Sequence, residues 1–322
     1  MPTIAVFGAT GAQGGSVVRQ LLKNPNWKVR GITRNVNSAS ARKLAQQGVE
    51  VVSADANDPP SVTAAITGAT AVFGITFFWD VAAAFGYERA ASVEMQQLKN
   101  MAIALDDSPT LEHFIVSALP SPSRSSGGKH HAPHFDVKQD GVDWIRDNLP
   151  GLWAKTTEFW GGFYASNMVG LEALRFHEVP ASKTRVLIAP SKPEGQLAFA
   201  ADIHTNAGIV VEGILKAGRK AFGRIAVCVT DYRSWREVAE VYERVTGRPT
   251  VYLGVDDETY TKLYGDFGTE FRLQLRWSEE YPSWHEAAGR EKIISLEELG
   301  VAGKLVGYDE AMEAMFKSGQ FA

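Results

Sequence analysis

Three glycines near the start of the chain have the spacing of a phosphate-binding turn. Residues 8–15 are GATGAQGG, and they directly follow the apolar run Thr3–Phe7. The first glycine permits a tight turn, the second lets the backbone approach a pyrophosphate, and the third lets the next helix pack closely on the strand. Free amide groups at the start of that helix favour an anion. The pattern therefore predicts a dinucleotide-binding turn. Its candidate cofactor contacts are Gly8, Thr10, Gly11, Gln13 and Gly14.

The end of the second expected strand indicates which dinucleotide binds. An NAD site usually has an acidic residue about twenty positions after the glycines, where it holds the ribose hydroxyls. Here the run Trp27–Thr33 contains no acid, and Arg34 follows it. A charge-assisted contact to a 2′-phosphate contributes about 1.5–3 kcal/mol, so Arg34 favours NADP(H) as the cofactor. Asp55 follows the third strand and is expected either near the adenine amino group or at a helix N-cap.

Strand-like and helix-like stretches alternate through the first half of the chain. The expected strands are Thr3–Phe7, Trp27–Thr33, Glu50–Ala54, Ala69–Thr76, Glu112–Ser117 and Leu152–Thr157. The expected helices are Ala12–Lys23, Ala39–Gln47, Pro59–Thr67, Glu88–Asp106 and Phe135–Asn148. This repetition predicts an α/β fold of Rossmann type, with a doubly wound parallel sheet.

The alternation weakens beyond about residue 158. Arg185–Ala189 and Arg224–Val229 are expected to return to the sheet as further strands. The later expected helices are Ala201–Lys216, Ser234–Thr246, Asp256–Tyr264 and Thr269–Ser278. We expect residues 1–157, with returning segments from about 185–230, to form the NADP(H)-binding domain. Residues 158–322 are expected to form a discontinuous, smaller and mostly helical lobe for a substrate or partner.

Five segments of the chain stand out together, namely residues 6–18 (VFGATGAQGGSVV), 32–34 (ITR), 74–80 (GITFFWD), 134–138 (HFDVK) and 162–167 (GFYASN). In their order and rough spacing they resemble the NmrA-like family, which comprises atypical members of the short-chain dehydrogenase/reductase superfamily. The resemblance covers about residues 3–230. It implies an NADP(H)-preferring Rossmann domain with a smaller C-terminal substrate lobe. Some members are redox sensors that bind NADP(H) and act on transcription regulators, and others are NADPH-dependent reductases.

Typical short-chain dehydrogenases carry Tyr-x-x-x-Lys on a helix, where the spacing places both side chains on one face. The lysine holds the nicotinamide ribose and the tyrosine relays a proton. In this chain Lys138 matches the lysine, and His134 stands where the tyrosine would be. We therefore take His134 and Lys138 as the candidate catalytic residues, with Lys138 also contacting the cofactor. Histidine suits acid–base work, but a capping, loop or substrate-contact role for His134 is the alternative.

Aromatic side chains follow several of the expected strands. Thr76 and Phe77 follow the fourth strand and are expected beside the nicotinamide ribose. The candidate substrate-pocket residues are Phe78, Trp79, Ser117, Trp160, Phe163 and Tyr164. Ser117 is expected either to polarise a substrate carbonyl or only to end its strand. The aromatic residues predict either a wide pocket for an aromatic or polycyclic substrate, or a core between the two lobes.

The bulk composition excludes several classes of function. The net charge of −4 gives no basic field for direct nucleic-acid binding, and no apolar run reaches the ~18–20 residues that cross a bilayer. The single cysteine, Cys228, is expected to be an inert core thiol. His130, His131 and His134 lack metal-site spacing, so we expect no metal. A cytoplasmic location is expected, with the nucleus as an additional one.

Two functions fit these residues. The first is an NADPH-dependent reductase of a carbonyl or conjugated double bond in an aromatic or polycyclic metabolite. The second is a non-catalytic NADP(H) sensor that regulates a protein partner, such as a transcription regulator. The lysine and the aromatic residues favour the enzyme, whereas the missing tyrosine favours the sensor. We favour the enzyme.

Overall fold

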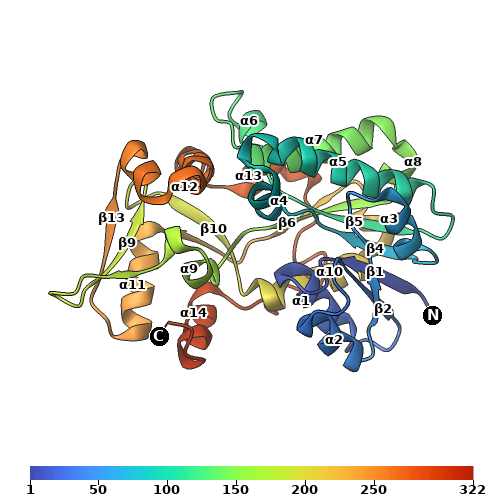
Figure 1. Ribbon diagram of the computed structural model, residues 1–322, viewed down its shortest axis with the longest axis horizontal. Helices are drawn as coiled ribbons and strands as arrows, with labels where there is room; N and C mark the ends of the chain where they lie inside the picture. The colour runs from blue at the N-terminus through green and yellow to red at the C-terminus, as the bar shows by residue number, and fades with distance from the viewer. Residues whose placement is uncertain (322) are drawn as a thin grey trace.

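The computed structural model describes residues 1–321 and has two lobes that lie side by side (Figure 1). The first lobe is built on a seven-stranded sheet with the order β11-β6-β5-β4-β1-β2-β3. Every neighbouring pair in this sheet is parallel. Its strands are β1 (Thr3–Phe7), β2 (Lys28–Thr33), β3 (Glu50–Ser53), β4 (Ala71–Gly74), β5 (His113–Ala118), β6 (Thr156–Gly161) and β11 (Ile225–Cys228). The predicted doubly wound parallel sheet is confirmed.

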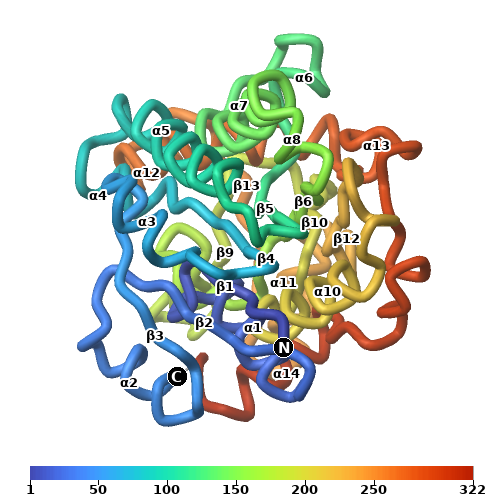
Figure 2. The backbone as a smooth tube through the Cα atoms, turned by 90° about the vertical axis from the view of Figure 1, so that its right-hand side faces the viewer, coloured from blue at the N-terminus to red at the C-terminus, as the bar shows by residue number. Residues whose placement is uncertain are grey.

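Helices cover both faces of this sheet (Figure 2). One face carries α1 (Ala12–Leu21), α2 (Ala39–Gln46) and α10 (Ile203–Ala217). The other face carries α3 (Pro59–Ile66), α5 (Tyr87–Asp106), α7 (Pro133–Asn148) and the short α8 (Pro150–Trp153). Each helical layer has its own buried apolar cluster against the sheet. The central strands are therefore buried on both faces, which explains their nearly continuous apolar sequences.

One strand begins later than predicted. The sequence predicts a strand over Leu152–Thr157, but the chain forms α8 first and β6 only afterwards. Pro150 opens α8 because its missing N–H needs no partner in the first helical turn. Leu152 is buried from this turn rather than from a strand. The strand consequently extends to Gly161 at the carboxyl edge of the sheet.

The second lobe contains helices and two small sheets. One sheet has the order β12-β10-β7 and the other β13-β9-β8. Their strands are β7 (Phe163–Tyr164), β8 (His177–Glu178), β9 (Arg185–Ala189), β10 (Gln196–Ala201), β12 (Asp231–Ser234) and β13 (Thr250–Gly254). The prediction that Arg185–Ala189 returns to the main sheet is wrong, because this segment pairs with β13 and β8. The prediction for Arg224–Val229 is confirmed, because β11 pairs with β6.

The helical part of the second lobe follows the predicted segments. Its main helices are α11 (Trp235–Thr246), α12 (Asp257–Glu280) and α14 (Tyr308–Lys317). Gly265 has a left-handed φ of 58° and breaks α12 in two, which matches the two separate helices expected there. The remaining short elements are α4 (Phe78–Phe85), α6 (Pro122–Ser125), α9 (Asn167–Gly170), α13 (Trp284–Ala288) and the 3-10 turns Glu172–Leu174, Gly218–Ala221 and Arg290–Lys292. Within residues 1–321, no helix combines the length and apolarity needed to span a membrane.

Candidate functional site

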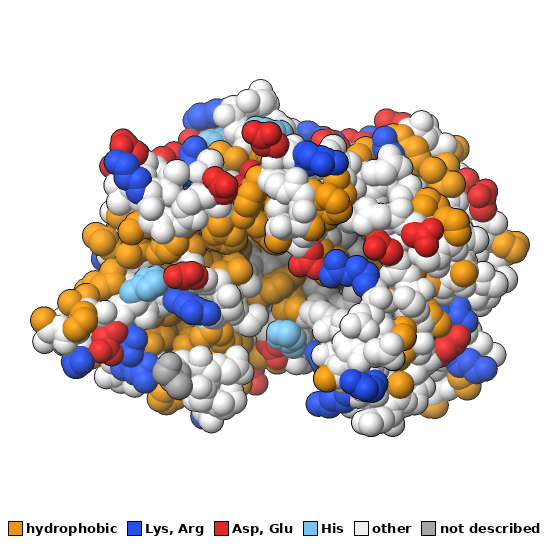
Figure 3. Space-filling view, viewed as in Figure 1, with side chains coloured by type: hydrophobic (Ala, Val, Ile, Leu, Met, Phe, Trp, Pro, Cys, Tyr) orange, Lys and Arg blue, Asp and Glu red, His pale blue; other side chains and the backbone are white. Residues whose placement is uncertain are grey.

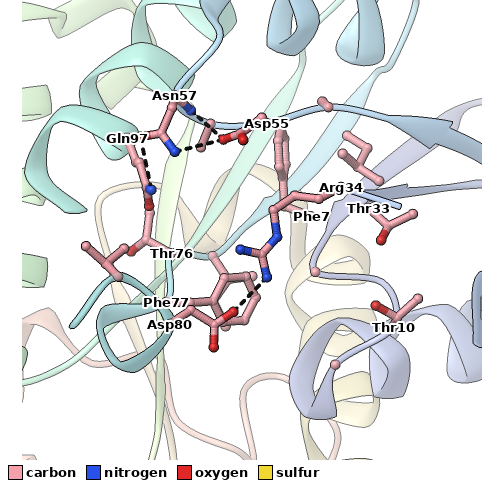
Figure 4. A pocket seen from close by; sticks show the side chains of 17 residues that line it. Phe7, Thr10, Thr33, Arg34, Asp55, Asn57, Thr76, Phe77, Asp80 and Gln97 are labelled. Atoms are coloured by element: carbon pink, nitrogen blue, oxygen red, sulfur yellow. Dashed lines mark hydrogen bonds and ion pairs between the residues drawn. The ribbon is translucent and has the colours of Figure 1, made fainter. Parts of the chain in front are cut away.

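A groove of about 300 Å³ lies at the carboxyl edge of the main sheet, beside the glycine turn (Figure 4). Ligands bind at this edge in open α/β sheets. The groove contains seven of the residues predicted to contact the cofactor: Gly8, Thr10, Gly11, Arg34, Asp55, Thr76 and Phe77. Its other lining residues are Phe7, Ile32, Thr33, Ala54, Ala56, Asn57, Ile75, Asp80, Val81 and Gln97.

The glycine turn has the backbone geometry that a pyrophosphate requires. Gly8 adopts a left-handed φ of 63°, and its carbonyl accepts from the Gly11 amide at 2.8 Å. A Cβ on Gly14 would stand 2.3 Å from the Gly8 carbonyl oxygen, so only glycine allows α1 to approach β1 this closely. No side chain caps α1 at Gly11. The helix start therefore remains available to an anion, and this cradle fits a dinucleotide.

The part of the groove beside β2 and β3 carries charged and amide side chains. The Asp55 carboxylate accepts from the backbone and side-chain nitrogens of Asn57, at 2.8 and 2.9 Å. The Gln97 amide donates to the Asn57 side-chain oxygen at 3.2 Å. Arg34 turns across the groove and pairs with Asp80, with 2.7 Å between Nη2 and Oδ2. Asp80 was not predicted as a partner of Arg34, although it belongs to the 74–80 segment.

A second cavity of about 340 Å³ adjoins the groove and shares Ile75, Thr76, Phe77 and Asp80 with it. It opens in the hollow between the two lobes, where hydrophobic side chains gather (Figure 3). The predicted residues that line it are Gln13, Phe78, Trp79, Ser117, His134, Lys138, Phe163 and Tyr164. Trp160 does not line it, because its indole is buried in the core and donates to Glu158 at 2.9 Å.

A chain of hydrogen bonds fixes one hydroxyl in the second cavity. Ser117 Oγ donates to Gln13 Oε1 at 2.8 Å, and Gln13 Nε2 donates to the Tyr164 hydroxyl at 2.7 Å. Burial raises the pKa of Tyr164 to about 12, although the Gln13 donor opposes this rise. Tyr164 therefore keeps its proton at neutral pH. Because its oxygen accepts from Gln13, its own O–H is left to donate to another group.

Lys138 is held by neighbours on two other elements. Its ammonium contacts the Glu94 carboxylate at 2.6 Å and the carbonyl and hydroxyl of Thr76 at 3.2 and 3.3 Å. Glu94 lies on α5 and is 1% exposed, and its second carboxylate oxygen has no hydrogen-bond partner. The buried pair fixes the lysine beside the residues that the two cavities share. The sequence could have indicated that Glu94 is buried, because it lies four residues after the apolar Ala90 and four before the apolar Leu98, on the same face of the helix.

His134 connects α7 to the second lobe. Its Nδ1 lies 2.7 Å from the Glu270 carboxylate, and its Nε2 lies 3.1 Å from the Gln274 side-chain oxygen. Both partners belong to α12. The ring is 3% exposed and its centroid lies 4.9 Å from that of Trp79. His134 therefore connects α7 to α12 at the wall of the second cavity. Its partners Glu270 and Gln274 were not predicted.

The fold and the groove define a Rossmann-type nucleotide-binding protein with a second lobe that closes a cavity at the same edge. The NmrA-like family model matches residues 1–307, and the chain belongs to this family. An NmrA-like family domain-containing protein from Dictyostelium discoideum is 27% identical over 296 residues, covering 90% of this chain and 91% of the relative. An NmrA-like family domain-containing oxidoreductase from Aspergillus campestris is 26% identical over 258 residues, covering 78% and 74%.

Solved structures share the whole fold. NmrA, a negative transcriptional regulator, superposes with a TM-score of 0.79 at 21% identity, covering 99% of this chain and 97% of NmrA. NmrA has also been solved in complex with NADP, and that structure gives a TM-score of 0.76. The triphenylmethane reductase of Citrobacter sp., solved with NADP(H), gives 0.68 at 18% identity and covers 97% and 99%. At these identities the likeness establishes the fold alone.

Proposed function

We propose that this chain is an NADPH-dependent reductase that acts on a carbonyl or conjugated double bond of an aromatic or polycyclic metabolite. The observation that carries the proposal is the junction of the two cavities at residues 75–77 and Asp80. A dinucleotide held at the glycine turn would lie along the groove toward the second cavity, which has a volume of about 340 Å³ for a substrate. NADP(H) in solved relatives and the oxidoreductase name of a curated relative support the cofactor and the class of reaction.

Different residues along the groove would hold different parts of the cofactor. The free amides at the start of α1 suit the pyrophosphate, whereas the Gly11 amide already donates to the Gly8 carbonyl. Arg34 suits the 2′-phosphate. Thr76 and Lys138 lie where the groove meets the second cavity, which suits the nicotinamide ribose. Bound NADPH supplies a hydride. The chain itself must orient the substrate, keep water away and supply the proton that balances the reduced product.

We assign the proton to Tyr164. Tyr164 lines the second cavity, its oxygen accepts from Gln13, and its raised pKa keeps it protonated. It donates to the oxygen or carbon that gains negative charge in the substrate, and the resulting phenolate accepts from Gln13. His134 is the second candidate, but both of its ring nitrogens already contact α12. Phe78, Trp79 and Phe163 supply flat apolar walls for a ring system.

The test is NADPH consumption with a panel of quinones, enones and ketones. We expect at least one class to be reduced, with product formed in step with NADPH oxidation. Tight NADPH binding without oxidation by any class would contradict the reductase and favour the sensor function. Two variants accompany the wild type. The double variant Lys138→Met/Glu94→Gln removes both charges of the buried pair at once. The single variant His134→Asn keeps an amide donor toward Glu270. Full activity in both would exclude Lys138 and His134 from catalysis.

Arg34→Ala is expected to weaken NADPH binding at least about tenfold, because a charge-assisted contact to the 2′-phosphate contributes about 1.5–3 kcal/mol. NADH has no 2′-phosphate, so its affinity should change much less. Fluorescence titration of both cofactors measures the two dissociation constants. Lys28→Ala, at an exposed position at the start of β2, is the control. Equal losses for NADPH and NADH would show that Arg34 does not contact the 2′-phosphate.

A further inference from the structure

An ion pair spans the cofactor groove. Arg34 follows β2 on one side, and Asp80 lies in the first turn of α4 on the other. Both side chains line the groove, and the guanidinium points across it toward the Asp80 carboxylate (Figure 4). The cation that suits the 2′-phosphate is therefore already held by an acid of the same chain.

We propose that Asp80 is an internal competitor for the 2′-phosphate and that it limits the preference of the chain for NADP(H) over NAD(H). The inference rests on the NADP(H) assignment made above. Arg34 contacts Asp80 through one nitrogen–oxygen pair, Nη2 to Oδ2 at 2.7 Å. A phosphate offers three acceptor oxygens and a charge of about −1.5 to −2 at neutral pH. When a 2′-phosphate enters, Arg34 exchanges the carboxylate for the stronger, bidentate partner.

The exposure of the pair sets the size of the effect. The Arg34 and Asp80 side chains are 67% and 52% exposed. Exposed ion pairs contribute at most about 1 kcal/mol, so breaking this pair weakens phosphate binding about 2- to 5-fold and does not prevent it. A nucleotide without the 2′-phosphate leaves the pair intact. Asp80 therefore lowers affinity only for the phosphorylated nucleotide, which is how it affects selectivity.

Two nucleotides that differ only in the 2′-phosphate provide the test. Adenosine 2′,5′-bisphosphate and 5′-AMP are titrated by calorimetry against the wild type, Asp80→Asn and the control Glu88→Gln. Glu88 is an exposed acid on α5 outside the groove, so its variant removes the same charge without touching Arg34. We expect Asp80→Asn to bind the bisphosphate about 2- to 5-fold more tightly, with 5′-AMP and the control unchanged. The gain should shrink at high salt, which screens exposed charges.

A double variant separates competition from simple repulsion. In an Arg34→Ala background, Asp80→Asn has no arginine to release, so the bisphosphate affinity should change by less than about twofold. The same gain in both backgrounds, or no gain in either, would overturn the competitor role. If Asp80 acts only as a first-turn acid of α4, Asp80→Asn lowers stability and leaves both affinities unchanged. These titrations need no turnover, so their failure is distinct from a failure to reduce a substrate.

Discussion

Tyr164→Phe is expected to lower kcat about 10²- to 10⁴-fold, the usual contribution of a positioned general acid. The substitution removes one oxygen and keeps the ring. Gln13 Nε2 loses its acceptor, whereas Ser117 still donates to Gln13 Oε1. NADPH affinity should therefore stay within about twofold of the wild type, because binding does not use the hydroxyl proton.

The measurement is single-turnover reduction of the best substrate from the panel, together with NADPH titration. Tyr252→Phe is the matched control, since its hydroxyl donates to the Ser191 carbonyl at 2.6 Å in the second lobe, outside both cavities. Its kcat should equal that of the wild type. If Tyr164→Phe retains more than about a third of wild-type kcat, the proton comes from another group.

The pH profile provides an independent check on the same residue. A general acid works while it holds its proton, and the pKa of Tyr164 is raised to about 12. The step that uses Tyr164 should therefore show no loss of rate from neutral pH up to about pH 11. A fall in kcat between neutral pH and about pH 11 would contradict Tyr164 as the proton donor.

The residues that follow strands could be placed from sequence, because strand ends meet at one edge of a parallel sheet. Gly8, Arg34, Asp55, Thr76 and Ser117 all follow or close predicted strands, and all line one of the two cavities. Each position depends only on local chain geometry and on the order of strands. Trp160 was placed wrongly for the same reason. It was expected to follow a strand that ends at Thr157, but it lies inside β6, and its side chain is buried in the core.

The partners of those residues could not be placed. Glu94 reaches Lys138 from α5, and Glu270 and Gln274 reach His134 from α12, 136 and 140 residues further along the chain. Contacts between helices depend on crossing angles and on lobe packing, which periodicity does not specify. The sequence also could not tell which sheet Arg185–Ala189 joins, because a short apolar strand has the same residue pattern in the main sheet as in a small one.

Gly14→Ala is expected to weaken NADPH binding by more than about 100-fold and to lower the free energy of unfolding by about 2–3 kcal/mol. An added Cβ would stand 2.3 Å from the Gly8 oxygen, 2.6 Å from the Gly8 carbonyl carbon and 2.7 Å from the Phe7 oxygen. All three are backbone atoms, so no rotamer relieves the overlap. Helix α1 must move away from β1, and this displaces the amides that suit the pyrophosphate.

The neighbouring position supplies the control for this clash. A Cβ on Gly15 would meet the flexible end of Arg19 at 3.1 Å, which can move aside, and the Ala9 carbonyl oxygen at 3.3 Å, a far smaller overlap than the 2.3 Å at Gly14. Alanine also favours a helix over glycine by about 1 kcal/mol, so Gly15→Ala should be as stable as the wild type. Urea unfolding and NADPH titration of both variants test the pair. If Gly14→Ala binds NADPH as tightly as Gly15→Ala does, close packing of α1 on β1 does not form the cofactor cradle.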